Sequence, residues 1–224
     1  MQNPWLGLDP HGTSYILDAD YKEIEHHNGR VVDSANKVIV QSIPEPFIGN
    51  PKLAKVVLLG LNPGHSPDDG DTYRGNADLR SAMFRNLRHE AQEYPFYPLN
   101  PAFRETGAGR WWRKRTRHLR EESGLDDCAL ADRLMVIEWF PYHSLSFAIP
   151  KKRCASQAYS FHLAQEMLQG GKFIILMRAK KLWSEVDSRF ADVQSLKNPQ
   201  CSYISRGNAG DWFPQMVKAL TSSP

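Results

Sequence analysis

Three short apolar runs constrain the fold of this chain more than any other feature. They cover Val56–Leu59, residues 134–137 and residues 173–177, and Gly60 closes the first. Uninterrupted apolar runs of this length are typical of strands buried on both faces of a sheet. A weaker run of the same kind covers residues 201–204. We therefore expect four buried strands.

Helical patterns lie between and after these runs. The apolar positions are Leu79, Met83, Leu87 and Ala91; Tyr159, Leu163, Met167 and Leu168 after Ser156; Leu182, Val186 and Phe190; and Trp212, Met216, Val217 and Leu220. Strands that alternate with helices favour a parallel sheet covered on both faces. The sequence thus predicts an α/β fold, a three-layer αβα sandwich around a mostly parallel four-stranded sheet.

The first 54 residues lack this alternation. Residues 30–32 and 37–40 are apolar and flank a polar turn at 33–36, which suggests a hairpin. Pro44 and Pro46 then interrupt the chain. We expect residues 1–54 to be an N-terminal extension packed on the core and residues 55–224 to be the α/β domain.

Composition is that of an ordinary globular protein. The 224 residues are 41% hydrophobic and 24% charged, which favours one large domain over a disordered chain. The N-terminus lacks signal-peptide features, and no apolar run is long enough to cross a bilayer. Three scattered cysteines suit a reducing compartment and cannot form a four-cysteine metal site. These features favour a cytoplasmic protein, with no membrane partner, metal or cofactor expected; we expect a monomer.

The net charge of +3 is small, but basic residues gather in one segment. Trp111 and Trp112 lie inside this segment, whose candidate nucleic-acid-binding residues are Arg110, Arg113, Lys114, Arg115 and Arg117. Such a cluster attracts phosphate. The alternative is a solvated helix face, answered by the acidic residues Glu121, Glu122, Asp126 and Asp127.

Ligands of open parallel sheets bind outside the carboxyl ends of the strands, so the loops there are the candidate site. Residues 60–66 follow the first strand, and the candidates among them are Gly60, Leu61, Asn62, Pro63, Gly64 and His65. The Pro-Gly pair forces a tight turn that pushes Asn62 into the crevice. The alternative is an ordinary turn.

Glu138, Tyr142 and His143 follow the second strand. The Glu138 carboxyl could accept hydrogen bonds from a ligand or be driven towards neutrality by burial; the alternative is an ion pair with an arginine. His143 and the adjacent serine are not predicted to be a hydrolase pair, because the chain lacks a Gly-x-Ser-x-Gly elbow. Arg178 ends the third strand and could contact a phosphate or pair with Glu138.

The last loop carries Ser205, Arg206 and Asn208 ahead of the final helix. Asn208 is a good N-cap, and the small residues around it could also form an anion cradle. Phe96 and Tyr97 lie in a proline-rich segment between the first two strands. These aromatics could stack on a planar ligand or fill the core.

Residues 55–64 resemble the strand and Gly-x-Asn-Pro-Gly loop of the uracil-DNA glycosylase superfamily, in its mismatch-specific and single-strand-selective branches. The later segments come in a similar order: an aromatic insert, a strand with a polar residue before a proline, then a strand, a loop and a C-terminal helix. The resemblance extends loosely to Leu220, and only the first motif is specific.

The resemblance implies roles for the strand-end residues. Asn62 matches the residue that positions the attacking water. Glu138 stands where those branches usually carry the asparagine that reads the base. The last loop of the family carries a histidine that stabilises the departing base, whereas residues 205–208 contain none, which leaves Arg206 or Asn208 to compensate.

Three functions follow as hypotheses. The chain could hydrolyse the N-glycosidic bond of a flipped damaged or mismatched base in DNA. It could instead be a weakly active or inactive module that binds nucleic acid or a nucleotide. The third hypothesis is a hydrolase of free nucleosides or related N-glycosides, with Glu138 as acid or base.

Overall fold

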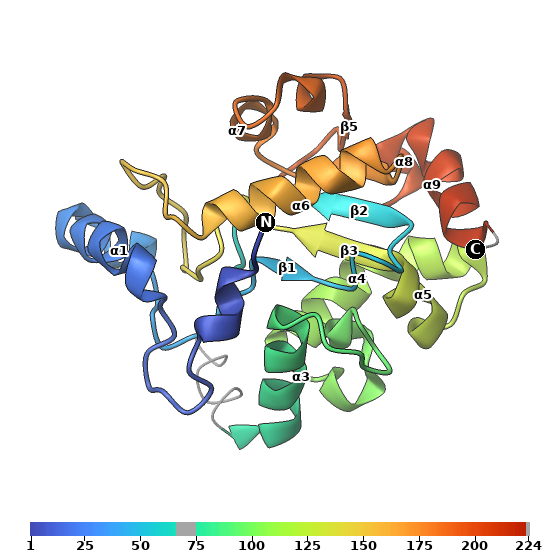
Figure 1. Cartoon of the computed structure of the whole chain (residues 1–224). Helices are drawn as coiled ribbons and strands as arrows, with labels where there is room; N and C mark the ends of the chain where they lie inside the picture. The colour runs from blue at the N-terminus through green and yellow to red at the C-terminus, as the bar shows by residue number, and fades with distance from the viewer. Residues whose placement is uncertain (66–74, 223–224) are drawn as a thin grey trace.

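A five-stranded sheet lies at the centre of the computed structural model, which describes residues 1–65 and 75–222 (Figure 1). The strands are β1 (Phe47–Ile48), β2 (Val56–Leu59), β3 (Leu134–Ile137), β4 (Phe173–Leu176) and β5 (Gln194–Ser195), in the order β1-β3-β2-β4-β5. Strands β2 to β5 are parallel, and β1 is antiparallel to β3. The predicted α/β fold is confirmed, with five strands instead of four.

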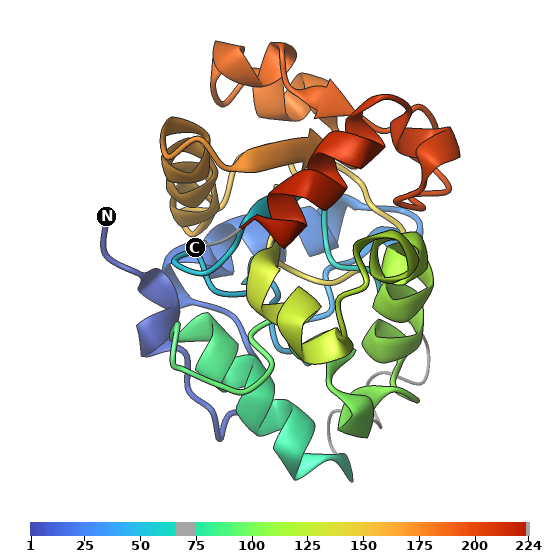
Figure 2. The ribbon, with the colours of Figure 1, turned by 90° about the vertical axis from the view of Figure 1, so that its right-hand side faces the viewer.

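Helices cover both faces of this sheet. They are α1 (Asp18–Arg30), α3 (Ala77–Leu87), α4 (Gly107–Ser123), α5 (Asp127–Arg133), α6 (Gln157–Gln169), α7 (Lys180–Ser184), α8 (Arg206–Ala209) and α9 (Trp212–Thr221). Helix α6 packs on β3 and β4 from one side, whereas α4 and α9 pack together on the other (Figure 2). Ser66, the end of the first predicted loop, lies outside the described residues.

The three strong apolar runs form the central strands. Leu59 is level with Ile137 on one side and with Leu176 on the other. Gly60, Glu138 and Met177 therefore leave the sheet at the same edge. Their strands are almost completely buried, as uninterrupted apolar runs predict.

The fourth predicted strand is wrong. Residues 201–204 form a turn and an extended loop, because Ser202 adopts a left-handed conformation (φ 49°). The loop is held by the backbone N–H of Ile204, which donates to the carbonyl of Arg115 at 3.1 Å. The last parallel strand is β5, whose two polar residues carry no apolar signal.

The predicted N-terminal hairpin is also wrong. Helix α1 runs to Arg30, and a 3-10 helix (Ser34–Asn36) fills the expected turn. The Asp33 side chain caps that turn by accepting a hydrogen bond from the N–H of Ala35 at 2.9 Å. Val32 is fully exposed, so its β-branched side chain has no sheet to pack on.

Two predicted helices end earlier than their patterns suggest. Helix α3 stops at Leu87 and does not reach Ala91, because His89 has a positive φ of 54°. Helix α7 stops at Ser184, and a 3-10 helix (Ser188–Ala191) continues the pattern. Other 3-10 helices are Pro4–Gly7, Tyr97–Leu99 and Pro101–Phe103.

Residues 1–54 share the core of the α/β fold. Strand β1 extends the sheet, and Trp5, Ile24 and Ile43 are buried. The Asn86 side chain of α3 holds this edge, because its amide donates to the Phe47 carbonyl at 2.7 Å and accepts from the N–H of Gly49 at 3.0 Å.

Candidate functional site

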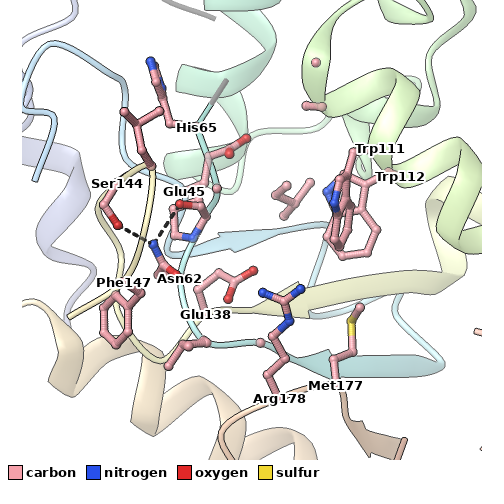
Figure 3. A pocket seen from close by; sticks show the side chains of 18 of the residues that line it. Glu45, Asn62, His65, Trp111, Trp112, Glu138, Ser144, Phe147, Met177 and Arg178 are labelled. Carbon is pink, nitrogen blue, oxygen red and sulfur yellow. Dashed lines mark hydrogen bonds between the residues drawn. The ribbon is translucent and has the colours of Figure 1, made fainter. Parts of the chain in front are cut away.

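A pocket of about 500 Å³ opens at the carboxyl ends of β2, β3 and β4 (Figure 3). After β2 the chain passes to β3 on one side, and after β3 it crosses to β4 on the other. The pocket therefore lies at the point where the strand order reverses, where open α/β sheets bind ligands. The predicted residues that line it are Gly60, Leu61, Asn62, Pro63, Gly64, His65, Glu138 and Arg178.

The floor of the pocket depends on contact between Glu138 and Gly60. The two residues follow neighbouring strands at the same level, and the Glu138 carboxyl lies against the Cα of Gly60. A Cβ at Gly60 would stand 2.1 Å from Oε2 of Glu138. The glycine is needed here because of the carboxyl beside it.

Glu138 is buried without compensation. Glu138 is only 9% exposed, and its Oε2 atom has no hydrogen-bond partner among the described residues. Burial raises the pKa of Glu138 to about 8, although the nearby Arg178 guanidinium acts in the opposite direction. No ion pair within 4 Å joins Glu138 to a basic side chain in the described ranges. Glu138 therefore holds its proton at neutral pH.

Asn62 lines the pocket and also fastens its own loop. Its Nδ2 donates to the carbonyl of Pro63 at 3.0 Å and to Oγ of Ser144 at 3.1 Å (Figure 3). A carbonyl can only accept, so this contact fixes which end of the amide is the nitrogen. Both hydrogens of Nδ2 are used, which leaves Oδ1 as the acceptor available to a ligand or water.

His143 is hydrogen-bonded to this loop but does not line the pocket. The residue is 1% exposed; its Nδ1 lies 2.7 Å from the Gly64 carbonyl and its Nε2 lies 2.9 Å from the Ile43 carbonyl. A neutral imidazole can donate to only one of these two carbonyls. The Glu45 carboxyl lies beside the ring, with Oε2 at 3.5 Å from Nε2.

Phe96, Tyr97 and Tyr142, which the sequence suggested as ligand contacts, do not line the pocket. Phe96 and Tyr97 are fully buried; Phe96 packs edge-on against Trp112 with 4.9 Å between the ring centroids, and Tyr97 donates its hydroxyl hydrogen to Glu45. Tyr142 is also buried and donates to Asp20 at 2.6 Å. These rings fill the core, which was the alternative for the proline-rich segment.

Trp111 and Trp112 form the aromatic wall of the pocket in place of Phe96 and Tyr97 (Figure 3). They lie in the first turns of α4. Gly109 of this helix packs directly against the preceding turn, because a Cβ there would stand 2.0 Å from the Phe103 carbonyl oxygen. The sequence signal for this wall is a glycine-rich helix start followed by paired tryptophans, which also lie inside the basic segment.

The last loop does not contribute to the pocket. The Asn208 amide is engaged with its neighbours, donating to the Tyr203 carbonyl at 2.8 Å and accepting from the N–H of Asn198 at 2.6 Å. Asn208 does not cap the final helix: it lies inside the short helix α8, which Ser205 caps, and Asp211 stands at the N-cap of α9. Arg206 pairs with Glu122 at 2.6 Å. Asn208 and Arg206 therefore do not join Asn62 and Glu138.

The basic segment of α4 divides into two groups. Arg113 pairs with Asp127 at 2.6 Å, Arg117 with Glu121 at 3.5 Å, and Arg110 donates to the carbonyl of Glu105. These contacts fit the solvated-face alternative. Lys114 and Arg115 instead lie over the ring of Tyr203, at 5.7 and 4.8 Å from its centroid.

Comparisons with protein-family models, curated proteins and solved structures found no match to this chain. Among the described residues, no group of three or more histidine, cysteine or acidic side chains is placed to hold a metal ion. No helix in the described ranges is long and apolar enough to span a membrane.

We expect Gly60→Ala to destabilise the protein by about 1–3 kcal/mol, because the added methyl group collides with the Glu138 carboxyl. Gly64→Ala in the same loop is the control, since a Cβ there meets nothing within 4 Å. In urea unfolding, Gly60→Ala should lower the free energy of unfolding by less in a Glu138→Ala background than in the wild type. Equal losses in both backgrounds would contradict the contact.

We expect Glu138→Gln to stabilise the protein increasingly between pH 4.5 and about 8. Over this range the unfolded chain releases the Glu138 proton and the folded chain retains it, so the wild type loses stability as pH rises. Unfolding free energies at pH 4 and pH 8.5 should give a variant advantage that grows by on the order of 2–4 kcal/mol.

The exposed Glu25→Gln serves as the control for that series. An advantage of Glu138→Gln that stays constant with pH would mean that the carboxyl is already ionised in the folded protein.

Proposed function

We propose that this chain is a divergent uracil-DNA glycosylase-like hydrolase, which cleaves the N-glycosidic bond of a damaged or mismatched base flipped out of DNA. One observation carries the proposal: Asn62, the neutral Glu138 and Trp111 line one pocket at the carboxyl ends of the central strands. That pocket combines a water acceptor, an acid and an aromatic surface, which this reaction requires.

Asn62 would hold the attacking water through its free Oδ1. An amide has no useful proton affinity, so Asn62 orients the water and does not deprotonate it. The water oxygen bonds to C1′ of the sugar while the bond from C1′ to the base nitrogen breaks. The proton lost by the water passes to solvent.

Glu138 would protonate or hydrogen-bond the departing base. A neutral carboxyl presents one donor and one acceptor, the same pair that an asparagine amide offers to a base edge. In its protonated form Glu138 can therefore replace the asparagine of the resembling branches. Its proton also neutralises the leaving base, a part for which the last loop supplies no histidine.

The indole of Trp111 would stack on the base in the pocket. Stacking on an aromatic side chain is worth roughly 1–3 kcal/mol per base and tolerates different bases. It offsets part of the energy needed to take a base out of the duplex stack.

The last loop favours a second candidate, a binding module without turnover. Arg206 and Asn208 are engaged elsewhere, so neither provides a donor where charge develops on the base. The pocket would then hold a base or nucleotide and release it unchanged.

Oligonucleotides that carry deoxyuridine, hypoxanthine, xanthine or a mismatch test the proposal at stoichiometric protein. We expect abasic sites in at least one, a rate that falls above pH about 8 as Glu138 ionises, and a loss of about 10²–10³ with Asn62→Ala. Asn50→Ala, a half-buried asparagine in a turn outside the pocket, is the matched control.

The outcomes separate the hypotheses. Binding of oligonucleotides without any abasic product supports the binding module and contradicts the hydrolase. Turnover of free nucleosides without oligonucleotide binding would instead support the nucleoside hydrolase.

A further inference from the structure

An arginine next to the aromatic wall of the pocket is held by two aromatic rings. The Cζ of Arg115 lies 4.5 Å from the centroid of Trp111 and 4.8 Å from that of Tyr203. The guanidinium therefore contacts two rings, and one of them also lines the pocket. Within the described ranges its Nε has no hydrogen-bond partner, and no carboxylate lies within 4 Å of it.

A second guanidinium, that of Arg178, lines the pocket itself (Figure 3). The Nε of Arg178 donates to the carbonyl of Pro199 at 3.0 Å and to Oγ of Ser202 at 3.1 Å, while Nη2 donates to the carbonyl of Gln200 at 3.3 Å. These bonds hold the group beside Glu138, at the centre of Figure 3. No donation by Nη1 to the described residues is seen.

The two arginines lie close together and lack a counter-charge. Arg178 bonds to Ser202 and Arg115 stacks on the next residue, Tyr203. Burial lowers the pKa of Arg115 most; Tyr203 acts in the opposite direction, and the Arg178 charge lowers the pKa by a smaller amount. Glu138 forms no ion pair within 4 Å with either arginine in the described ranges, so Arg178 in the pocket and Arg115 beside its tryptophan wall keep their positive charges.

Three other arginines of the described residues are neutralised by a close carboxylate. Arg113 and Arg206 each have a carboxylate oxygen at 2.6 Å, from Asp127 and Glu122, and so does Arg189, from Asp187. Arg115 and Arg178 are held in place by rings and carbonyls, which leave their charge available. Rigid, unneutralised guanidinium groups suit the several oxygens of a phosphate.

We propose that Arg115 and Arg178 form a phosphate-binding subsite, which takes the phosphate attached to the nucleoside whose base enters the pocket. This inference rests on the proposed function for the base, but the phosphate contact itself requires no bond cleavage. The ligand is a phosphate ester, either a free nucleotide or the phosphodiester of a strand.

Binding titrations at constant ionic strength, followed by tryptophan fluorescence, test the subsite. The ligands are sodium phosphate, the deoxynucleosides, their 5′-monophosphates and a five-nucleotide single strand. We expect the monophosphates or the strand to bind at least about tenfold more tightly than the nucleosides. The monophosphate and strand arms distinguish the two sources of phosphate.

Variants assign the effect to the two arginines. Arg115→Gln and Arg178→Ala should each remove most of the preference for phosphorylated ligands, and the control Arg189→Ala, whose arginine pairs with Asp187 on another part of the surface, should preserve it. Thermal unfolding checks that each variant is folded. Since Arg178→Ala removes bonds to residues 199–202, Arg178→Lys is the second variant, and it should weaken the preference.

The NMR signal of the Arg115 Nε–H group reports phosphate binding in the absence of a nucleobase. It should shift in NMR spectra on addition of sodium phosphate and not of sodium chloride at equal ionic strength. Equal affinities for nucleosides and monophosphates, or an unchanged preference in Arg115→Gln, would overturn the subsite. Phosphate-dependent binding without abasic products would support the subsite while the hydrolase proposal fails.

Discussion

The rest of the site depends on a carboxyl group that is buried at the end of a strand without an ion-pair partner within 4 Å among the described residues. Glu138 follows β3 at the level where Gly60 follows β2, and the absence of a Cβ at Gly60 is what lets the carboxyl fit. Burial without a partner favours the neutral acid, with its pKa raised to about 8. The chemistry proposed for the pocket follows from that charge state.

The surrounding loops keep this acid in a defined setting. His143 is hydrogen-bonded to the carbonyl of Gly64 and so holds the loop that carries Asn62, while the Glu45 carboxyl lies beside the ring. Because Glu138 is neutral, Arg178 in the pocket and Arg115 behind Trp111 keep their positive charges. The burial of Glu138 therefore has two consequences: its carboxyl keeps a hydrogen to donate to a base, and the neighbouring arginines keep a positive charge for a phosphate.

The sequence predicted the central strands and the edge where the pocket opens, because uninterrupted apolar runs and the strand-end rule act locally. It could not tell Phe96 and Tyr97, which fill the core, from Trp111, which lines the pocket, since aromatic residues suit both places. The sequence did not predict the true position of Asn208, because the last strand, β5, consists of only two polar residues. The short helix α8, which contains Asn208, also ends before the final helix.

Infrared difference spectroscopy of the wild type minus Glu138→Gln tests the central claim most directly. We expect the carbonyl stretch of a protonated carboxylic acid at neutral pH, lost with a midpoint near pH 8 as the carboxylate bands appear. A difference spectrum that shows only carboxylate bands at pH 6 to 7 would contradict the account. It would mean that Glu138 is ionised, and the acid assigned to the pocket would be absent.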